Sequence, residues 1–370
     1  MDNIFNATKK LGLGLMRLPM TDGVPEYGKI SEMIDALMAE GFNYFDTAHG
    51  YMGGTSETVA KKCLSEKYDR NSFVLTNKLS TFHFTQHEEI RPLFYQQLEA
   101  CGVDYFDFYL MHAQDKEIFE KYKKCRAYET ALELKEEGKI KHLGISFHDK
   151  PDVLRQILTE YPQIEVVQIQ LNYADYDNPA VESYGVYKVC REFNKPIIVM
   201  EPVKGGCLAS LPSKADAIFR KLGDASAASY AIRYAASFEG VEMVLSGMGN
   251  MDMVKDNMQF MNHFSPLSAK EQEAIDEVRE VFASQNLIPC TACEYCLEVC
   301  PAKIPIPGHF SSLNNHKAFE SPNAKLYYEM RIKKGGKASD CIKCGECEKI
   351  CPQHLKIRSL LEDVVNAFEN

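Results

Sequence analysis

The sequence predicts an α/β protein, in which a (β/α)8 barrel (a TIM barrel) precedes a small cysteine-rich domain. Three observations lead to this prediction. Apolar, β-rich runs alternate with helix-like segments, the alternation repeats eight times, and eight of the 13 cysteines fall after position 289. Near-continuous apolar runs separated by helices are typical of parallel strands buried on both faces. Eight such units in about 260 residues have the size and order of a (β/α)8 barrel.

The eight apolar runs are the expected strands of this barrel. They cover residues 12–19, 42–48, 72–80, 105–112, 141–148, 165–173, 196–203 and 241–248. The segments between them carry helix punctuation, since Ser31 begins a segment that ends at Gly41 and another ends at Gly138. A doubly wound sheet is the alternative, because it gives the same alternation, but usually with fewer strands and a glycine-rich first turn.

Length, composition and charge exclude several classes of protein. Of the 370 residues, 45% are hydrophobic and 25% are charged, so the chain is globular rather than disordered. No apolar run reaches the roughly 18 residues of a membrane span, and the N-terminus lacks the apolar stretch of a signal peptide. We therefore expect a cytoplasmic protein without membrane partners. A net charge of −10, with no basic stripe, also argues against nucleic acid as a partner.

The character of the sequence changes near residue 265. Ser268 and Glu271 form a capping-box pattern ahead of a helix-like segment, and the cysteine-rich part follows. We expect three parts, namely a barrel over residues 1–266, a linker helix over 267–288 and a small domain over 289–370.

Two cysteine motifs in the last part share the spacing C-x2-C-x2-C-x3-C-P, which is that of bacterial [4Fe–4S] proteins. Three cysteines with two residues between each can surround one cluster with their thiolates. The fourth cysteine of each motif then reaches the other cluster. The motifs therefore predict two [4Fe–4S] clusters with crossed ligands. One cluster would be held by Cys290, Cys293, Cys296 and Cys351, and the other by Cys341, Cys344, Cys347 and Cys300.

Zinc is the competing interpretation, because C-x2-C pairs also bind structural zinc. The third cysteine of each motif and the proline after the fourth favour an iron–sulfur cluster. A disulfide framework is favoured least, because cytosolic chains do not usually keep disulfides. The cysteines outside the motifs are interpreted as small buried hydrophobic side chains: Cys63, Cys101, Cys125, Cys190 and Cys207.

Four polar residues mark the predicted active site of the barrel. In this fold the chemistry takes place at the carboxyl ends of the strands. Asp46, Lys78 and His112 lie at the ends of the second, third and fourth expected strands, and Tyr51 follows on the loop after the second. Taken singly, Asp46 and Lys78 are often only a structural ion pair, and His112 is more often a core histidine. Together, an acid, an ammonium, an imidazole and a phenol are expected to converge at one mouth.

These four side chains suit the reduction of a carbonyl group. A tyrosine has an ordinary pKa of about 10, and a nearby ammonium lowers that pKa by favouring the phenolate. Lys78 can act in this way, with Asp46 holding it charged and oriented. His112 can donate a hydrogen bond to the carbonyl oxygen of a substrate. Tyr51 then protonates the developing alkoxide while hydride arrives at carbon.

The segment FDTAHGYMGGTSETVAKKCL, which contains Asp46 and Tyr51, resembles the signature of the aldo/keto reductase superfamily. Lys78 and His112 follow at family-like intervals of 32 and 34 residues, and KIKHLGISFH is similar to the segment with the family's fifth strand. The tail resembles a two-cluster bacterial ferredoxin. The whole chain therefore resembles aldo/keto reductases that carry a C-terminal, ferredoxin-like iron–sulfur domain.

This resemblance implies NAD(P)H as a cofactor. Ser146 and Gln168 would bind the nicotinamide carboxamide, and the glycines before a helix offer a seat for the phosphates. The implied residues at the phosphate and adenine end are Gly247, Gly249, Asp256 and Asn257.

Several positions depart from the family pattern. NADP-selective members carry Lys and Arg where this chain has Gly247 and Met253. Met200 replaces the tyrosine that stacks on the ring in many members, and Phe147 replaces an asparagine. We therefore expect no strong preference for NADPH over NADH. The altered pocket also leaves room for FMN.

The two parts of the chain together predict an oxidoreductase. Nicotinamide transfers two electrons as hydride, whereas a cluster transfers one at a time, and a flavin bridges the two regimes. The favoured activity is interconversion of small-molecule carbonyls and alcohols with NAD(P)H, with the clusters in electron transfer. One alternative is a flavin- or cluster-fed reductase that takes electrons from an external donor, such as a redox partner protein. The other is a non-catalytic redox sensor or electron-transfer subunit.

Overall fold

The computed structural model describes residues 4, 5, 7, 9–178, 181–285, 287–290, 292, 294–319, 321, 323–351 and 353–370. Its contacts divide the chain into two compact units. The first, here called the barrel unit, comprises Met1–Tyr176, Val181–Val203 and Ala228–Leu267. The second, the tail unit, comprises Asp177–Ala180, Lys204–Ala227 and Ser268–Asn370. The tail unit therefore includes a segment inserted between two barrel strands.

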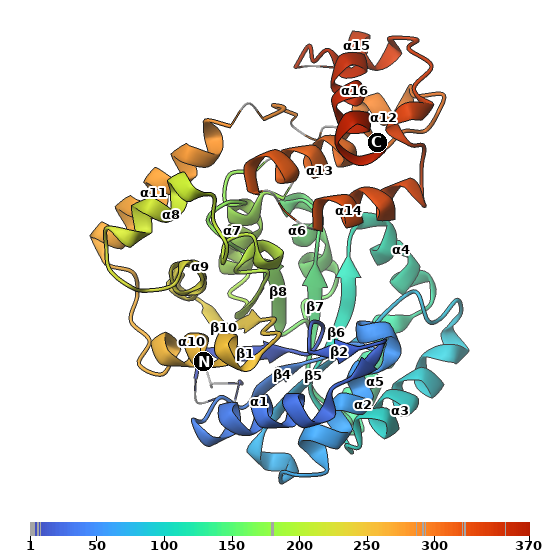
Figure 1. The fold of residues 1–370 in the computed structure, drawn as a ribbon. Helices are drawn as coiled ribbons and strands as arrows, with labels where there is room; N and C mark the ends of the chain where they lie inside the picture. The colour runs from blue at the N-terminus through green and yellow to red at the C-terminus, as the bar shows by residue number, and fades with distance from the viewer. Residues whose placement is uncertain are drawn as a thin grey trace. The chain divides into compact units, whose positions relative to one another are not determined.

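Eight parallel strands close the barrel in the order β1-β10-β9-β8-β7-β6-β5-β4 (Figure 1). They are β1 (Leu11–Gly14), β4 (Tyr44–Asp46), β5 (Val74–Leu79), β6 (Phe106–Gln114), β7 (Ile140–Phe147), β8 (Val166–Gln170), β9 (Ile197–Met200) and β10 (Val241–Ser246). Each expected apolar run overlaps one of these strands, so the predicted barrel is confirmed and the doubly wound alternative is wrong. A short hairpin of β2 (Met20–Thr21) and β3 (Val24–Pro25) was not expected.

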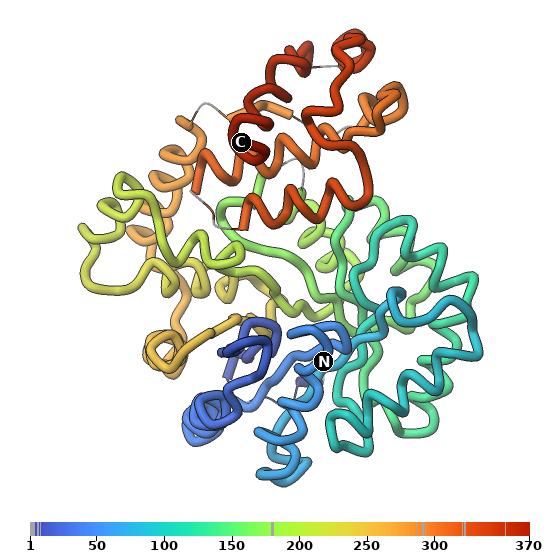
Figure 2. The backbone as a smooth tube through the Cα atoms, turned by 45° about the vertical axis from the view of Figure 1, so that its right-hand side comes forward, coloured from blue at the N-terminus to red at the C-terminus, as the bar shows by residue number. Residues whose placement is uncertain are grey.

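Helices alternate with the strands along the barrel unit, and their coils can be followed along the tube of Figure 2. They are α1 (Tyr27–Ala39), α2 (Ser56–Ala60), α3 (Ile90–Cys101), α4 (Lys116–Lys124), α5 (Ala127–Glu136), α6 (Pro151–Glu160), α7 (Ser183–Glu192), α9 (Ala227–Ala236) and α10 (Met251–Met261). Helix α1 begins at Tyr27, ahead of the expected Ser31, and ends before Gly41, whose φ of 82° suits a helix C-terminus.

The inside of the barrel is filled by side chains and is not a pore. A buried apolar cluster there includes Tyr44 of β4, Phe108 and Leu110 of β6 and Val166 of β8. Gly144 of β7 allows this packing, because a Cβ at that position would lie 2.5 Å from Val166 Cγ1 and 2.6 Å from Leu110 Cδ2. This core fixes the strands whose ends carry the predicted site.

The tail unit is built from helices with its own hydrophobic core. The helices are α8 (Ser213–Arg220), α11 (Ala269–Ala283), α12 (Tyr295–Glu298), α13 (Ile306–Phe319), α14 (Asn323–Ile332), α15 (Glu346–Ile350) and α16 (Ile357–Phe368). Ser268 caps α11 in a capping box with Glu271, so the predicted helix start is confirmed. No helix in the described parts of the chain combines the length and the apolar character that a membrane crossing requires.

Candidate active site and metal sites

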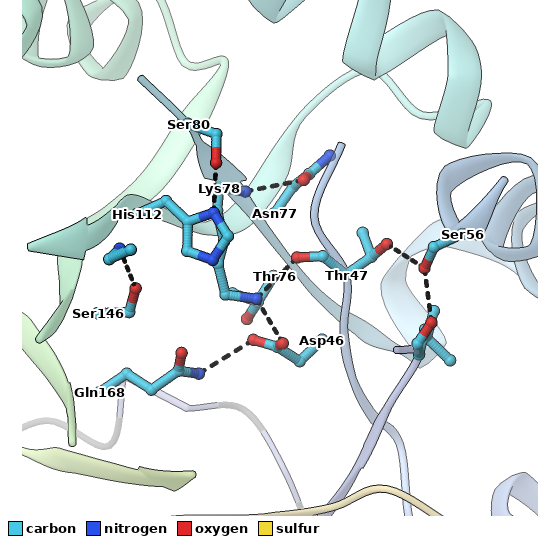
Figure 3. A network of polar contacts seen from close by, with 12 residues as sticks. Asp46, Thr47, Ser56, Thr76, Asn77, Lys78, Ser80, His112, Ser146 and Gln168 are labelled. Atoms are coloured by element: carbon cyan, nitrogen blue, oxygen red, sulfur yellow. Dashed lines mark hydrogen bonds and ion pairs between the residues drawn. The ribbon is translucent and has the colours of Figure 1, made fainter. Parts of the chain in front are cut away.

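The structure brings the four predicted catalytic side chains together. Asp46 ends β4, Lys78 lies in β5 and His112 lies in β6, three strands that are neighbours in the barrel. Lys78 Nζ lies 2.5 Å from Asp46 Oδ1 and donates to the Thr47 carbonyl at 2.8 Å (Figure 3). Tyr51 begins a 3-10 turn (Tyr51–Gly54), with its ring centroid 4.8 Å from Lys78 Nζ and 5.9 Å from the His112 ring.

The Lys78 ammonium is fully buried, and Asp46 is 3% exposed. Burial alone would lower the pKa of Lys78, but the carboxylate of Asp46 and the contact with Tyr51 raise it above its ordinary value. A buried charge is tolerated when it is paired and hydrogen-bonded in this way. The base of the site therefore holds a permanent ammonium.

The pKa of Tyr51 differs from the expectation. The charge of Lys78 lowers the pKa of Tyr51, as predicted, but burial of the phenol raises it more, and the pKa stays above its ordinary value. The charge pair was visible in the sequence but the extent of burial was not, so the expected net lowering of the Tyr51 pKa is wrong. Tyr51 consequently keeps its proton at neutral pH.

His112 is held by Ser80, whose Oγ lies 2.5 Å from His112 Nδ1. Burial and the nearby Lys78 ammonium keep the pKa of His112 well below its ordinary value, so the ring is neutral. When the Ser80 hydroxyl donates to Nδ1, the proton sits on Nε2. A neutral His112 can then donate one hydrogen bond to a substrate oxygen.

The two residues expected to bind the carboxamide of a nicotinamide are buried and pair across β7 and β8. Ser146 Oγ accepts a hydrogen bond from the backbone N–H of Ala113 at 2.8 Å. Gln168 Nε2 donates to Asp46 Oδ2 at 3.1 Å, as Figure 3 shows. Gln168 thus belongs to the hydrogen-bond network of the four predicted catalytic residues, Asp46, Tyr51, Lys78 and His112, which we call the tetrad. The sequence did not reveal this role.

The expected phosphate seat lies between β10 and α10. Gly247 and Gly249 precede α10, whose first turn is capped by Asn250 accepting from Met253 N at 2.9 Å. A Cβ at Gly247 would lie 3.6 Å from Arg17 Cδ, so Arg17 packs over this turn. The sequence did not single out Arg17, because it follows β1 at the other end of the chain.

The two residues implied for the adenine end lie on α10. Asn257 is buried, and its Nδ2 donates to Ser246 Oγ at 2.7 Å, which ties α10 to the end of β10. Asp256 is half-buried on the same helix. Asn257 therefore faces inward toward the end of β10, whereas Asp256 stays partly exposed.

A second polar group follows β4. His49 Nδ1 lies 2.7 Å from Glu57 Oε2, and Asn77 Nδ2 donates to Glu57 Oε1 at 2.8 Å. The hydrogen bond with Glu57 raises the pKa of His49. The His83 ring contacts His49 edge-on at 4.6 Å. The sequence did not single out these residues, although Glu57 lies within the family-like segment around Tyr51.

Two cavities in the tail unit are lined by cysteines of the two motifs. Cys300, Cys341, Cys344 and Cys347 line one of them. Cys290, Cys296 and Cys351 line the other. Each cavity thus contains the last cysteine of one motif and cysteines of the other motif, which is the grouping that crossed ligation requires.

The predicted ligand Cys293 lies outside the described residues. Outside the motifs, the five remaining cysteines are all buried, which agrees with their interpretation as small hydrophobic side chains.

A barrel with these four side chains at the strand ends, together with paired cysteine-lined cavities, defines an oxidoreductase. The chain belongs to the aldo/keto reductase family, whose model, described as "Aldo/keto reductase family", matches residues 10–280. A second model, described as "4Fe-4S dicluster domain", matches residues 289–355.

Among curated proteins, the chain is similar to an aldo-keto reductase of Mycobacterium sp. (strain KMS), with 27% identity over 170 residues that cover 45% of this chain and 56% of the relative. It is also similar to the NADH-specific methylglyoxal reductase of Escherichia coli (strain K12), with 29% identity over 188 residues, or 45% and 54% of the two chains. The chain spans little more than half the length of several curated relatives that it matches.

Among solved structures, the chain is similar to an aldo-keto reductase from Klebsiella pneumoniae in complex with NADPH. The TM-score is 0.58 and the identity 18%, and the match covers 73% of this chain and 90% of that one. At this identity the likeness shows the shared fold.

Proposed function

We propose that the chain interconverts small-molecule carbonyls and alcohols with NAD(P)H, and that Tyr51 is its proton donor. The observation that supports this most directly is the buried Lys78–Asp46 pair beside the Tyr51 ring, next to a neutral His112. A bound nicotinamide supplies or accepts the hydride. All other roles fall to side chains of this chain.

In the reduction direction, His112 donates a hydrogen bond to the carbonyl oxygen and orients it. Tyr51 gives its proton to the same oxygen as hydride reaches the carbon, so one hydride and one proton convert the carbonyl to the alcohol. Lys78 stabilises the phenolate that remains on Tyr51, and Asp46 holds Lys78 in place. In the oxidation direction the same phenolate accepts the proton of the alcohol.

The residues near the mouth suit a nicotinamide nucleotide. Ser146 and Gln168 offer a hydroxyl and an amide side by side, which match the donor and acceptor atoms of a carboxamide. The turn of Gly247 and Gly249 precedes an 11-residue helix, where backbone N–H groups favour phosphate. One relative is named NADH-specific and one structural neighbour is bound to NADPH. The proposal therefore includes both nucleotides.

The dicluster tail supports a second candidate function. Two [4Fe–4S] clusters, held by the cysteines that line the two cavities, would transfer single electrons. In this candidate an external donor feeds the clusters, and FMN in the barrel unit joins one-electron to two-electron chemistry.

One experiment separates these functions. The protein is purified without oxygen, its iron, sulfide and any released flavin are measured, and small aldehydes and ketones are offered with no partner protein present. Turnover with NADH or NADPH alone supports the first function. Turnover only with reduced methyl viologen supports the second. Failure with all donors contradicts both and favours a non-catalytic sensor or electron-transfer subunit.

A further inference from the structure

Four lysines of the tail unit form what we call the basic patch. They are exposed, and no ion pair joins any of them to a carboxylate in the described parts of the chain. By contrast, Lys343 pairs with Glu362 and Arg358 with Glu348 in the same unit. The basic patch comprises Lys303, Lys333, Lys334 and Lys337.

The basic patch lies against one of the two cysteine-lined cavities. Lys303 N donates to the Cys300 carbonyl at 3.0 Å, and Gly336 N donates to the Lys303 carbonyl at 3.0 Å. A Cβ at Gly336 would lie 2.4 Å from the carbonyl oxygen of Ala302, which lines the cavity. The loop from 333 to 337 is therefore packed onto the wall of the cavity that contains Cys300 and Cys341.

The same cavity has exposed side chains in its lining. Cys344 is exposed, and its neighbour Ile342, which also lines the cavity, has 68% of its surface exposed. An exposed apolar side chain next to a ligand cysteine, with lysines on the adjoining loop, has the composition of a small contact surface with a charged rim.

Charge identifies the class of partner. The whole chain has a net charge of −10, which repels other acidic proteins, whereas residues 289–370 contain 11 lysines and arginines against 10 acidic residues. The sequence from 330 to 339 has no carboxylate. Asp340 and Glu369 lie near the loop, where they accept hydrogen bonds from Lys337 N and from Ser339. The four lysines of the basic patch outnumber these two carboxylates, so the loop keeps an excess of positive charge.

We propose that the basic patch docks a small acidic electron-carrier protein. One electron would leave the reduced carrier and pass to the cluster that Cys300, Cys341, Cys344 and Cys347 would hold. Complementary charge steers such encounters, which are small and transient between redox proteins. This inference rests on the dicluster part of the proposed function and is independent of the carbonyl chemistry of the barrel.

The test measures electron transfer into full-length protein that was purified without oxygen. The probe is a reduced, strongly acidic plant-type ferredoxin, and bleaching of the cluster absorbance is followed by stopped flow. The second-order rate constant is expected to fall at least about tenfold between roughly 10 mM and 0.5 M salt. Reversing the four charges (Lys303→Glu, Lys333→Glu, Lys334→Glu and Lys337→Glu) should lower the low-salt rate by a similar factor and remove the salt dependence.

Two controls keep the result specific. Reversal of four exposed lysines of the barrel unit, Lys29, Lys62, Lys116 and Lys124, should leave the ferredoxin rate high. Reduction by methyl viologen, a small cation, should stay as fast in the patch variant as in the wild type, which shows that the clusters are intact. If the fourfold variant loses its clusters, the double variant Lys333→Ala/Lys334→Ala should show a smaller loss in the same direction.

Three outcomes would overturn the inference. They are a ferredoxin rate that does not depend on salt, a patch variant as fast as the wild type, and binding of phosphatidylserine vesicles that the patch variant loses while its ferredoxin rate stays normal. The last would assign the patch to a lipid surface. Absence of cluster absorbance and of viologen reduction in the wild type would instead reject the dicluster part of the proposed function.

Discussion

The barrel unit and the tail unit position their candidate functional side chains in different ways. In the barrel unit three of the four candidate catalytic residues lie in paired strands, with Asp46 opposite Thr76 and Lys78 opposite Leu110, and Tyr51 follows in the turn after β4. In the tail unit the described cysteines of the two motifs lie on loops and on the short helices α12 and α15. The first site is preorganised by its own fold, whereas we expect the second to depend on the clusters that its thiolates would bind.

The hydrophobic cores of the two units also differ in whether they contain candidate functional residues. The barrel strands pack against a large apolar core that contains none of the tetrad. The core of the tail unit is smaller and includes Cys296, Cys347 and Cys351. The predicted ligands are therefore part of what holds the tail unit together, so loss of the clusters should affect the two units unequally.

The largest expected effect is that of removing the clusters. Chelation of iron without oxygen should abolish amide protection over 294–370, because the ligands belong to the core of the tail unit, while strands β4 to β8 keep theirs. Hydrogen exchange followed by mass spectrometry measures both regions in one sample. Equal protection of the tail before and after iron loss would show that its fold does not depend on the clusters.

The crossed ligation predicts a pattern of iron loss. Cys351→Ser should remove about four of roughly eight iron atoms per chain, and Cys290→Ser on the same background should remove no more. Adding Cys300→Ser to Cys351→Ser should instead empty both sites. The control is Cys190→Ser, since Cys190 is buried in the barrel unit. A further loss on adding Cys290→Ser would contradict the crossed assignment.

The eight barrel strands could be predicted from sequence because each is a local apolar run that needs no distant information. The cysteine motifs could be found for the same reason. The hydrogen bond from Gln168 to Asp46 could not, because it joins residues 122 positions apart through barrel closure. The net pKa shift of Tyr51 could not be predicted either, because it depends on burial by the folded mouth. Membership of 204–227 in the tail unit likewise depends on tertiary contacts.

Within the barrel, the largest effect should come from Tyr51→Phe. The change removes one hydroxyl and keeps the ring, so turnover of a carbonyl substrate should fall by about 10²–10⁴, the usual contribution of a positioned general acid. Steady-state kinetics measures the loss. Tyr128→Phe is the matched control, because Tyr128 is buried and its hydroxyl has no hydrogen-bond partner in the described residues. Iron content should stay unchanged in both variants, and near-normal turnover in Tyr51→Phe would exclude the proposed proton donor.

Lys78→Met tests the electrostatics beneath Tyr51. Since Lys78 lowers the pKa of Tyr51, its loss should raise that pKa further, and alcohol oxidation, which needs the phenolate, should shift to higher pH. The variant also leaves the carboxylate of Asp46 buried without its cation, at a cost of about 3–5 kcal/mol in unfolding free energy. Urea titration and a pH profile of oxidation measure the two effects. A profile unchanged in pH would mean that Lys78 does not act on the phenol.

The smallest expected effect concerns the nucleotide. Gly247 offers no cation for a 2′-phosphate, and Met253, with 49% of its surface exposed, contacts the N–H of Gly249 through its sulfur at 3.4 Å. NADPH and NADH should therefore differ less than 100-fold in Kd, or about 2.7 kcal/mol, by fluorescence titration.

Met253→Arg places a guanidinium at the start of α10 and should shift the preference toward NADPH at least about tenfold. Tyr95→Arg, at an exposed position on α3, should not. A wild-type preference for NADPH above 100-fold would instead point to Arg17, the cation that packs over Gly247. Arg17→Ala would then remove that preference, and the phosphate seat would depend on the residues after β1 as well as on those before α10.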